Sequence, residues 1–302
     1  MVSPSNPFVH KLTRQVRFSI TPFYGEPVES ILQADLSAVR VADAEGANPY
    51  ASRPAGEGLS IFFELSVALT GGLDRSTGFV MNVLDIDETV RQIVVPLFAK
   101  KIKTDFKQGR HISLYDLAEI LKSAQKRLAG KFDKTVLSEL TLKLNPFRKL
   151  SLDCSRAAPA LSEAEREDYE MINFSEKFEF AAMHRLWNDK FSDERNFALF
   201  GKCANPSGHG HNYIIEVTIE TAPQGSDFCI GDFEKIVDNE FIKRVDHKNL
   251  NVDVPHLSSV NPTVENIASF AWDSLVDKFG PAKLHCVTVW ETDKTSCSYY
   301  GG

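Results

Sequence analysis

Alternating apolar and polar residues mark the strands in the second half of the chain. We predict strands in this half at 172–184, 209–220, 284–291 and 295–300, because every second residue there is apolar or histidine. Two helices lie between the second and third of these strands. One spans about 232–244, and the other begins at Thr263, a plausible N-cap, and ends at Gly280.

The first half of the chain predicts the same order of elements. Its strands are expected at 15–21, 59–70, 137–144 and 148–152. A helix at 85–98 is expected to bury Ile86, Val90, Ile93 and Leu97. A second helix begins at Ser113, which with Asp116 three residues later resembles a capping box. The repeated order of strand, strand, helix, helix, strand, strand predicts an internal duplication and an α+β fold with antiparallel sheets.

A polar, acidic and alanine-rich stretch separates the two halves. We interpret 153–170 as a linker, so that the first domain spans 1–152 and the second spans 171–302. Either domain is long enough to bury a core of its own. A further loop is expected at 43–58.

Composition and charge exclude several classes of function. The net charge of −7 argues against broad nucleic-acid binding, which usually needs a basic surface. No apolar run approaches the roughly 20 residues that span a bilayer, and the N-terminus has no apolar signal core. We therefore expect a cytoplasmic protein with no membrane or nucleic-acid partner. The five cysteines, odd in number and irregular in spacing, fit reduced thiols.

Histidine concentrates in the second half, where six of the eight lie between His184 and His285. His209 and His211 are two residues apart on one predicted strand, so both imidazoles point to one face and can reach one metal ion. His184 ends the preceding strand with the same parity. Three neutral histidines leave one tetrahedral position open, which is typical of a catalytic zinc. A surface pair or a hydrogen-bonded core pair is the alternative for His209 and His211.

Other polar residues of this half add candidate chemistry. Cys203 lies in a polar, glycine-containing loop, where a nearby dication would stabilise its thiolate as a base; the alternative is a small buried hydrophobe. Asp246 and His247 follow a helix and form either a proton relay or a helix-end pair without function. Glu291 ends a strand, where its carboxylate either binds two parallel N–H groups of a flat heterocycle or is simply solvated.

Five separated segments resemble the 6-pyruvoyl-tetrahydropterin synthase family in order and spacing. They are FEFAAMHRL, FGKCANPSGHGHNY, VDHKNLNVDVP, NPTVENIA and VWETD, and they cover about 174–300. The resemblance implies the tunnelling fold, which is built from ββααββ units and assembles into barrels with active sites between subunits. Here it implies two tandem units and a homo-oligomer whose sites lie at subunit or repeat interfaces.

The resemblance also implies roles for individual residues. One Zn²⁺ per chain would be bound by His184, His209 and His211. The catalytic residues would be Cys203 as general base, the relay of Asp246 and His247, and Glu291. The substrate-binding residues would be Thr263, Glu265 and Glu291, the last as anchor of the pterin ring. Arg185, Lys202 and Lys248 are candidates for binding a triphosphate, which Mg²⁺ would accompany.

The implied activity is that of a lyase in tetrahydrobiopterin biosynthesis. Its substrate would be 7,8-dihydroneopterin triphosphate, which loses triphosphate and rearranges to 6-pyruvoyl-tetrahydropterin. A 6-carboxytetrahydropterin synthase of the queuosine and deazapurine route uses the same substrate. Three residues usually separate its cysteine from HGH, whereas five separate them here, which favours the pyruvoyl enzyme. Cys203 argues against an aldolase-like activity. A non-catalytic scaffold that binds zinc or pterin is the alternative from a different class.

The first half departs from the family pattern. Its segment GFVMNVLDID at 78–87 resembles a family segment usually written GMVMN, yet it has no HGH motif and no matching cysteine. An ungapped pairing gives the counterparts of His209, His211 and Glu291 as Glu57, Leu59 and Leu144. We therefore predict a degenerate repeat without a metal site of its own.

Overall fold

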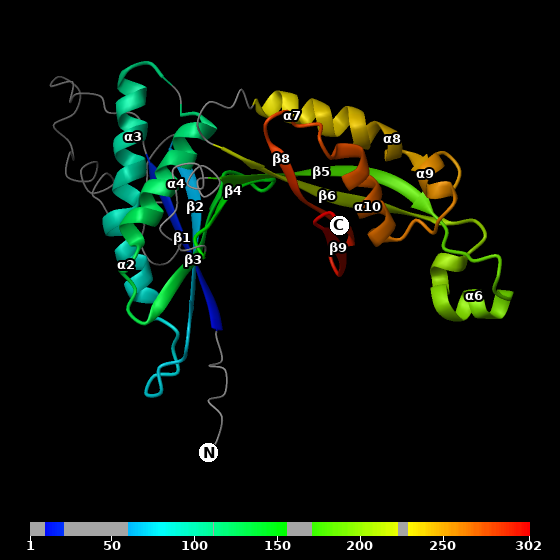
Figure 1. Cartoon of the computed structure of the whole chain (residues 1–302), viewed down its shortest axis with the longest axis horizontal. Coiled ribbons are helices and arrows are strands. Elements are labelled where there is room, and N and C mark those ends of the chain that lie inside the picture. Colours follow the sequence, from blue (N-terminus) through cyan, green and yellow to red (C-terminus); the bar gives the residue numbers. More distant parts are fainter. Residues whose placement is uncertain (1–9, 21–59, 111, 156–170, 223–228) are drawn as a thin grey trace, which may run out of the picture. The chain divides into compact units, whose positions relative to one another are not determined.

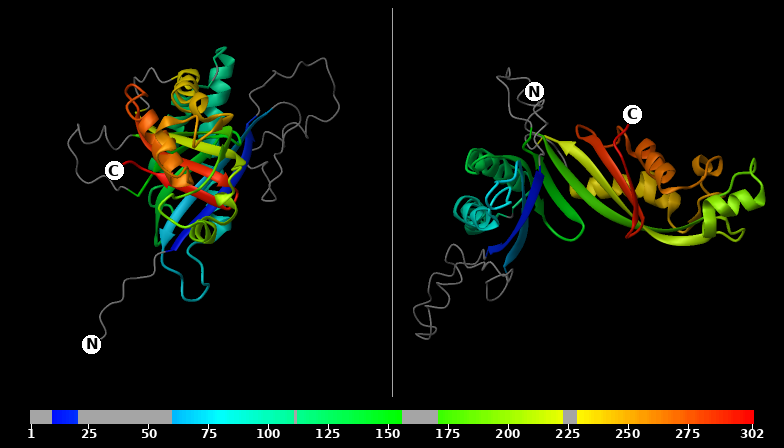
Figure 2. Two further views of the ribbon diagram at one scale, coloured as in Figure 1. Left: turned by 90° about the vertical axis from the view of Figure 1, so that its right-hand side faces the viewer. Right: turned by 90° about the horizontal axis from the view of Figure 1, so that it is seen from below.

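The computed structural model describes residues 10–20, 60–110, 112–155, 171–222 and 229–302 (Figure 1). It divides into two compact units, Met1–Ile172 and Asn173–Gly302. In each unit, helices cover one face of an antiparallel sheet, as two further views also show (Figure 2). The predicted mixture of helix and antiparallel sheet is therefore confirmed. The loop at 43–58 and most of the linker at 153–170 lie outside the described residues.

The sheet of unit 1 has four antiparallel strands. They are β1 His10–Ile20, β2 Ile61–Gly71, β3 Thr135–Lys143 and β4 Arg148–Asp153, in that spatial order. Phe18 on β1 pairs with Phe63 on β2, and their ring centroids lie 5.4 Å apart. The ring of Phe98 packs against both, at 5.2 and 5.0 Å. Burying each of these side chains contributes roughly 1.5–3 kcal/mol and joins the sheet to its helices.

The helices of unit 1 differ from the prediction at one point. They are α2 Val83–Ile93, α3 Val95–Lys107 and α4 Leu114–Leu128. The single helix predicted at 85–98 is wrong, since α2 ends before Val94 and α3 restarts with Pro96 in its first turn, where a missing N–H costs little. Val94 and Phe98 are consequently buried, rather than Ile93 and Leu97. The capping box of Ser113 and Asp116 at the start of α4 is confirmed.

Unit 2 has the four predicted strands. They are β5 Ile172–His184, β6 His209–Thr221, β8 Lys283–Thr292 and β9 Thr295–Tyr299, in that spatial order. A short strand, β7 Lys248–Asn249, pairs with β5 in parallel. The described strands of each unit form an open sheet, and a barrel built from such sheets stays a prediction.

The helices of unit 2 correct the prediction for 232–244. They are α6 Asp193–Phe200, α7 Ile230–Val237, α8 Lys243–Val245, α9 Pro255–Ser258 and α10 Val264–Leu275, with a 3₁₀ turn η1 Gly201–Ala204 and a π turn η2 Asp238–Ile242. The π turn interrupts the predicted helix. Phe233, Val237, Phe241 and Val245 are all buried at a spacing of four residues, which is longer than the 3.6 residues of an α turn. The wide π turn keeps them on one face.

The start of α10 is as predicted, and its end is not. The side chain of Thr263 accepts a hydrogen bond from the backbone N–H of Asn266, which confirms it as the N-cap. The helix ends at Leu275, because Val276 leaves the helical conformation and Asp277 has a φ of +61°. Gly280 therefore lies beyond the helix end.

The two sheets share a β-bulge at the same place. The β2–β3 register shifts between Ala68 and Leu69, and the β6–β8 register shifts between Thr218 and Ile219. Counting from the bulge makes Ile61 the counterpart of His211, and makes Leu144 the counterpart of Glu291. Alignment on the bulge thus moves the counterpart of His211 by two residues from the ungapped pairing and leaves that of Glu291 unchanged, while the duplication itself stays a prediction. Glu57 and Leu59 lie outside the described residues.

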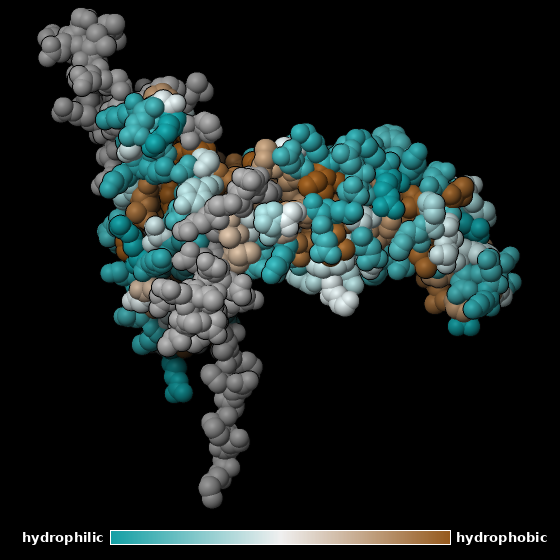
Figure 3. Space-filling view, turned by 45° about the horizontal axis from the view of Figure 1, so that its top comes forward, coloured by the Kyte–Doolittle hydropathy of each residue, from teal (hydrophilic) through white to brown (hydrophobic). Residues whose placement is uncertain are grey.

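The visible surface over the helices of unit 2 is largely hydrophilic (Figure 3). Apolar side chains gather near α6, where Phe197 and Leu199 are 48% and 59% exposed. No helix in the described part of the chain is long and apolar enough to cross a bilayer.

Candidate metal centre

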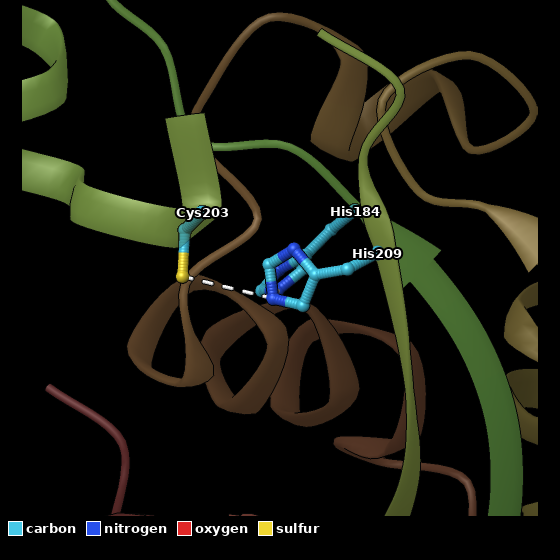
Figure 4. Close-up of side chains that lie close together, drawn as sticks. All are labelled: His184, Cys203 and His209. Carbon is cyan, nitrogen blue, oxygen red and sulfur yellow. Dashed lines mark hydrogen bonds between the residues drawn. The ribbon is translucent and has the colours of Figure 1, made fainter. Parts of the chain in front are cut away.

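Three segments of unit 2 meet at one end of its sheet. His184 ends β5, His209 begins β6, and Cys203 lies on η1 in the connection between them (Figure 4). The backbone N–H of Leu186 donates to the carbonyl of Cys203 at 2.8 Å and fixes η1 against the strand end. Gly208 has a φ of +66°, and a Cβ there would lie 2.9 Å from the carbonyl oxygen of His184. Glycine is therefore needed for this close return of the chain.

His184 is fully buried and its ring is oriented by the backbone. Its Nδ1 lies 2.7 Å from the carbonyl oxygen of Pro262, which can only accept a hydrogen bond. This contact assigns the proton to Nδ1 and leaves a lone pair on Nε2. Burial lowers the pKa of His184, so the ring is neutral at pH 7. A neutral imidazole fixed by a backbone carbonyl is the usual state of a metal ligand.

The distances around His209 fit a shared metal ion. Its Nε2 lies 3.1 Å from Nε2 of His184 and 3.6 Å from Sγ of Cys203 (Figure 4). Ligands of a tetrahedral zinc, at about 2.3 Å for sulfur and 2.0 Å for nitrogen, lie about 3.5 Å (S to N) and 3.3 Å (N to N) apart. Burial and the charge of Glu291 raise the pKa of the Cys203 thiol. A bound cation would oppose both effects.

His211 and Glu291 approach the same point from the other side. The Oε1 atom of Glu291 lies 3.4 Å from Nε2 of His184 and 3.7 Å from Nε2 of His211. Nε2 of His211 and Nδ1 of His209 are buried nitrogens without a hydrogen-bond partner. Leaving a buried polar atom unpaired costs about 1–3 kcal/mol, which indicates that a ligand belongs there.

The three predicted ligands, His184, His209 and His211, do not share one group of donor atoms. His184 belongs to two overlapping groups, with Cys203 and His209 in one and with His211 and Glu291 in the other, and the donor atoms of each group lie within 4.8 Å of one another. Nitrogen, sulfur and one carboxylate oxygen are the donors that Zn²⁺ takes. Mg²⁺ prefers an all-oxygen shell, so these residues do not fit it. The centre fits zinc.

The Asp246–His247 pair lies outside both groups. One carboxylate oxygen of Asp246 accepts the backbone N–H of Ala181 at 2.9 Å, and the other lies 2.8 Å from Nδ1 of His247. The Ala181 N–H and then His247 lower the pKa of Asp246. His247 has a φ of +56°, and its side chain is 82% exposed. The pair is thus firmly held, yet it presents its imidazole to the outside of its own unit.

Thr263 and Glu265 also lie outside the two groups. Thr263 uses its hydroxyl to cap α10, and Glu265 occupies the first turn of that helix. Burial, and after it the charge of Glu265, raises the pKa of Cys297 on β9. Contact of either residue with substrate stays a prediction.

A polar cleft adjoins the centre at His184 and Gly208. It has a volume of about 810 Å³, and asparagine and serine side chains supply much of its lining. Of the three candidate triphosphate ligands, Arg185 lines this cleft. Lys190 lines it as well. The Arg185 guanidinium stacks on the ring of Trp187 at 4.0 Å, and its Nε donates to the Ala204 carbonyl at 3.1 Å. Lys202 and Lys248 are exposed residues that do not line the cleft.

Two features of the centre had no signal in the sequence. The contact that orients His184 comes from the backbone carbonyl of Pro262, and any residue would provide one. The position of Glu291 beside two histidines depends on the pairing of β8 with β6, so its strand-end location alone did not indicate a metal contact.

Comparisons with known proteins place this site in a family. A family model described as 6-pyruvoyl tetrahydropterin synthase matches residues 173–302. The human 6-pyruvoyl tetrahydrobiopterin synthase is 42% identical over 130 residues, which cover 42% of this chain and 90% of the human protein. The chain belongs to the 6-pyruvoyl tetrahydropterin synthase family.

Other members of the family are more distant. A 6-carboxy-5,6,7,8-tetrahydropterin synthase of Aquifex aeolicus is 27% identical over 157 residues, which cover 41% of this chain and 95% of that protein. A solved structure of the Caenorhabditis elegans 6-pyruvoyl tetrahydropterin synthase is 30% identical, with a TM-score of 0.40, and covers 44% of this chain and 96% of that one. The family model begins at residue 173 and matches unit 2.

Proposed function

We propose that this chain is a zinc-dependent 6-pyruvoyl-tetrahydropterin synthase that acts on 7,8-dihydroneopterin triphosphate. The observation that carries the proposal is the convergence of His209, Cys203, His211 and Glu291 on His184 in two overlapping donor groups, with Nε2 of His211 buried and unpaired. Identity of 42% with the human synthase over nearly its whole length supports the same reaction. A scaffold without activity would have no use for a cysteine beside the metal.

The residues of the centre divide the work of the reaction. A zinc ion bound by His184, His209 and His211 would act as a Lewis acid on a side-chain hydroxyl of the substrate. Cys203, 3.6 Å from Nε2 of His209, accepts the proton from the adjacent carbon. Loss of triphosphate and internal redox rearrangement then give the pyruvoyl product.

Further residues bind and orient the substrate. Glu291 accepts two N–H groups of the pterin ring, and Thr263 and Glu265 line the ring pocket. Arg185, in the polar cleft beside His184, is placed to bind the triphosphate, which Mg²⁺ accompanies.

The relay of Asp246 and His247 serves a site between subunits. The 82% exposure of the His247 side chain supports this, because a firmly held imidazole that faces outward is available to a neighbouring molecule. Sites of this kind require a homo-oligomer, which we expect to be a barrel of tunnelling-fold units.

Unit 1 is then a degenerate tandem copy that completes the barrel. The shared bulge position and element order support duplication, while Ile61 and Leu144 stand where unit 2 has His211 and Glu291. One zinc per chain follows. None of the five cysteines forms a disulfide in the described residues, which include them all, and this supports a cytoplasmic enzyme.

Product analysis tests the proposal. Zinc-loaded protein is incubated with 7,8-dihydroneopterin triphosphate beside the Cys203→Ala variant, and the products are identified by mass spectrometry. A pyruvoyl product that is absent with the variant is expected. A carboxy product with acetaldehyde would move the enzyme to the deazapurine route, and absence of turnover would contradict the proposal.

A further inference from the structure

Glu291 occupies an unusual place at the end of β8. Trp290 pairs with Ser296 of β9 and Thr292 pairs with Thr295, so Glu291 is an extra residue between two adjacent pairs. Bulges of this kind occur next to active sites. The side chain is only 19% exposed. Glu291 shares the parity of Val287 and Val289, which are fully buried, so its carboxylate points to the same face as they do, at the end of the sheet that holds the histidines.

The contacts of the Glu291 carboxylate resemble metal coordination more than hydrogen bonding. Its Oε1 atom lies 3.4 Å from Nε2 of His184 and 3.7 Å from Nε2 of His211. A separation of 3.7 Å is too long for a hydrogen bond, and Nε2 of His211 has no hydrogen-bond partner. Oxygen and nitrogen ligands of one tetrahedral zinc are about 3.3–3.5 Å apart.

The carbonyl of Pro262 excludes a hydrogen bond from His184 to this oxygen. Because the proton of His184 lies on Nδ1, its Nε2 presents a lone pair to the carboxylate, and two acceptors face each other. Only a cation between them, or a proton on one of them, makes that arrangement favourable. The geometry therefore calls for a metal that both atoms bind.

We propose that Glu291 is a protein ligand of the metal in the substrate-free enzyme, and that it leaves the metal when the pterin ring binds. The inference rests on the proposed function, in which the same carboxylate anchors the ring. Its donor atom lies within 4.8 Å of those of His184 and His211, and His209 completes the proposed shell of four ligands, closed as in structural zinc sites. Capture of Glu291 by the ring opens the fourth position to the substrate hydroxyl. Binding of the pterin ring and release of the fourth coordination position of the metal then occur in the same step.

Cys203 is the competing fourth ligand. Its sulfur lies 3.6 Å from Nε2 of His209 and shares a donor group with His184 and His209, as the carboxylate does with His184 and His211. A thiolate bound to the metal would be withdrawn from its use as a base. The proposed role of Cys203 as base therefore favours Glu291 as the ligand, and the test distinguishes the two.

The test uses cobalt in place of zinc, because the visible spectrum of Co²⁺ reports its ligands. Wild-type protein is compared with Glu291→Gln, which keeps the shape of the side chain. Glu265→Gln serves as matched control, since that carboxylate lies outside both donor groups. Metal affinity is measured by competition with a chelator, and folding is checked by circular dichroism. A Glu291→Asp variant keeps an oxygen ligand on a shorter side chain. It provides a second test if the Glu291→Gln variant does not fold.

We expect Glu291→Gln to change the visible cobalt bands and to weaken metal binding by about 10- to 100-fold, with Glu291→Asp intermediate and Glu265→Gln unchanged. Saturating 7,8-dihydroneopterin should shift the wild-type bands. Equal spectra and affinities for wild type and Glu291→Gln would overturn the inference. So would a thiolate-to-cobalt charge-transfer band that disappears in Cys203→Ser.

The same preparations separate this inference from the proposed function. A pyruvoyl product from wild type, together with a metal affinity that is unchanged in Glu291→Gln, would overturn the inference and support the proposed function. A Glu291-dependent metal site without turnover of 7,8-dihydroneopterin triphosphate would overturn the function and keep Glu291 as a ligand.

Discussion

The two units share an order of elements but differ in their buried ionisable groups. In unit 1 the buried carboxylate of Asp87 accepts two hydrogen bonds from Arg14, at 2.7 and 3.1 Å, and buried Asp105 is bound by Lys101 and Arg110. In unit 2, Nδ1 of His209 and Nε2 of His211 at the end of the sheet are left without hydrogen-bond partners. An unpaired buried nitrogen in a cluster of possible metal ligands calls for an explanation, and a bound ion would provide one.

Under the proposed duplication, the two units would show how a fold can persist without its site. Aligned on the bulge, Ile61 and Leu144 stand opposite His211 and Glu291, and Gly109 and His247 both have positive φ just after a helix. The functional side chains of unit 2 would then be replaced in unit 1 by apolar side chains or by hydrogen.

Among the substitutions proposed here, removal of one metal ligand should have the largest effect on zinc content and activity. His211→Ala is expected to lose bound zinc and to reduce activity to background, because His211 supplies one of the converging nitrogens. His285→Ala, at the start of β8 and outside both donor groups, is the matched control. Metal content by mass spectrometry and turnover are measured together. Full zinc occupancy in His211→Ala would contradict the assignment.

Loss of the general base, Cys203, should lower activity without loss of the bound zinc. We expect Cys203→Ala to lower kcat by about 10²- to 10⁴-fold while zinc remains bound, as for removal of a general base. Cys297→Ala, a half-buried cysteine of β9, is the control. A variant that keeps wild-type kcat would exclude Cys203 as the base.

Complementation tests the site between subunits. His247→Ala alone is expected to lose about 10²-fold in kcat. Co-expression of Cys203→Ala and His247→Ala chains should restore up to about a quarter of wild-type activity, since sites between two chains can combine one intact residue from each. Activity no higher than that of the separate variants would place both residues in one subunit's site.

The pH dependence of metal binding follows from burial. Burial lowers the pKa of His184 and of His209, so both rings stay neutral below the ordinary value of about 6.5. Because zinc binds neutral imidazole, its affinity should change little down to pH 6.5 and fall only below it. Chelator competition across pH measures this. A fall that is already complete at pH 6.5 would refute it.

Substitution of either of two glycines by alanine is expected to have the smallest effect, and it is measured as a change in the free energy of unfolding. Gly208 and Gly130 both have positive φ, but only at Gly208 would a Cβ meet the carbonyl of His184, at 2.9 Å. Gly130→Ala should cost about 1–2 kcal/mol in free energy of unfolding. Gly208→Ala should cost about 1–3 kcal/mol more and also weaken metal binding. Urea denaturation compares the two, and equal costs would show that the loop accommodates the methyl group.

Alternation along the chain predicted the strands of both units within a few residues, because one face of each is buried. Periodicity failed where Pro96 divides a helix and where a π turn replaces an α turn, since both change the phase of the buried face. The weakly amphipathic α6 was also missed. For the centre, parity predicted the histidines, but the contacts of Pro262 and Glu291 are tertiary and have no local pattern.

The metal content of the wild-type chain tests the central claim most directly. If all of the metal chemistry lies in unit 2, native mass spectrometry should count about one zinc per chain, and none in His211→Ala. A count near two per chain would show that unit 1 has a metal site of its own. A zinc that persists in His211→Ala would show that His211 is not needed to hold the metal, and either result would contradict the assignment.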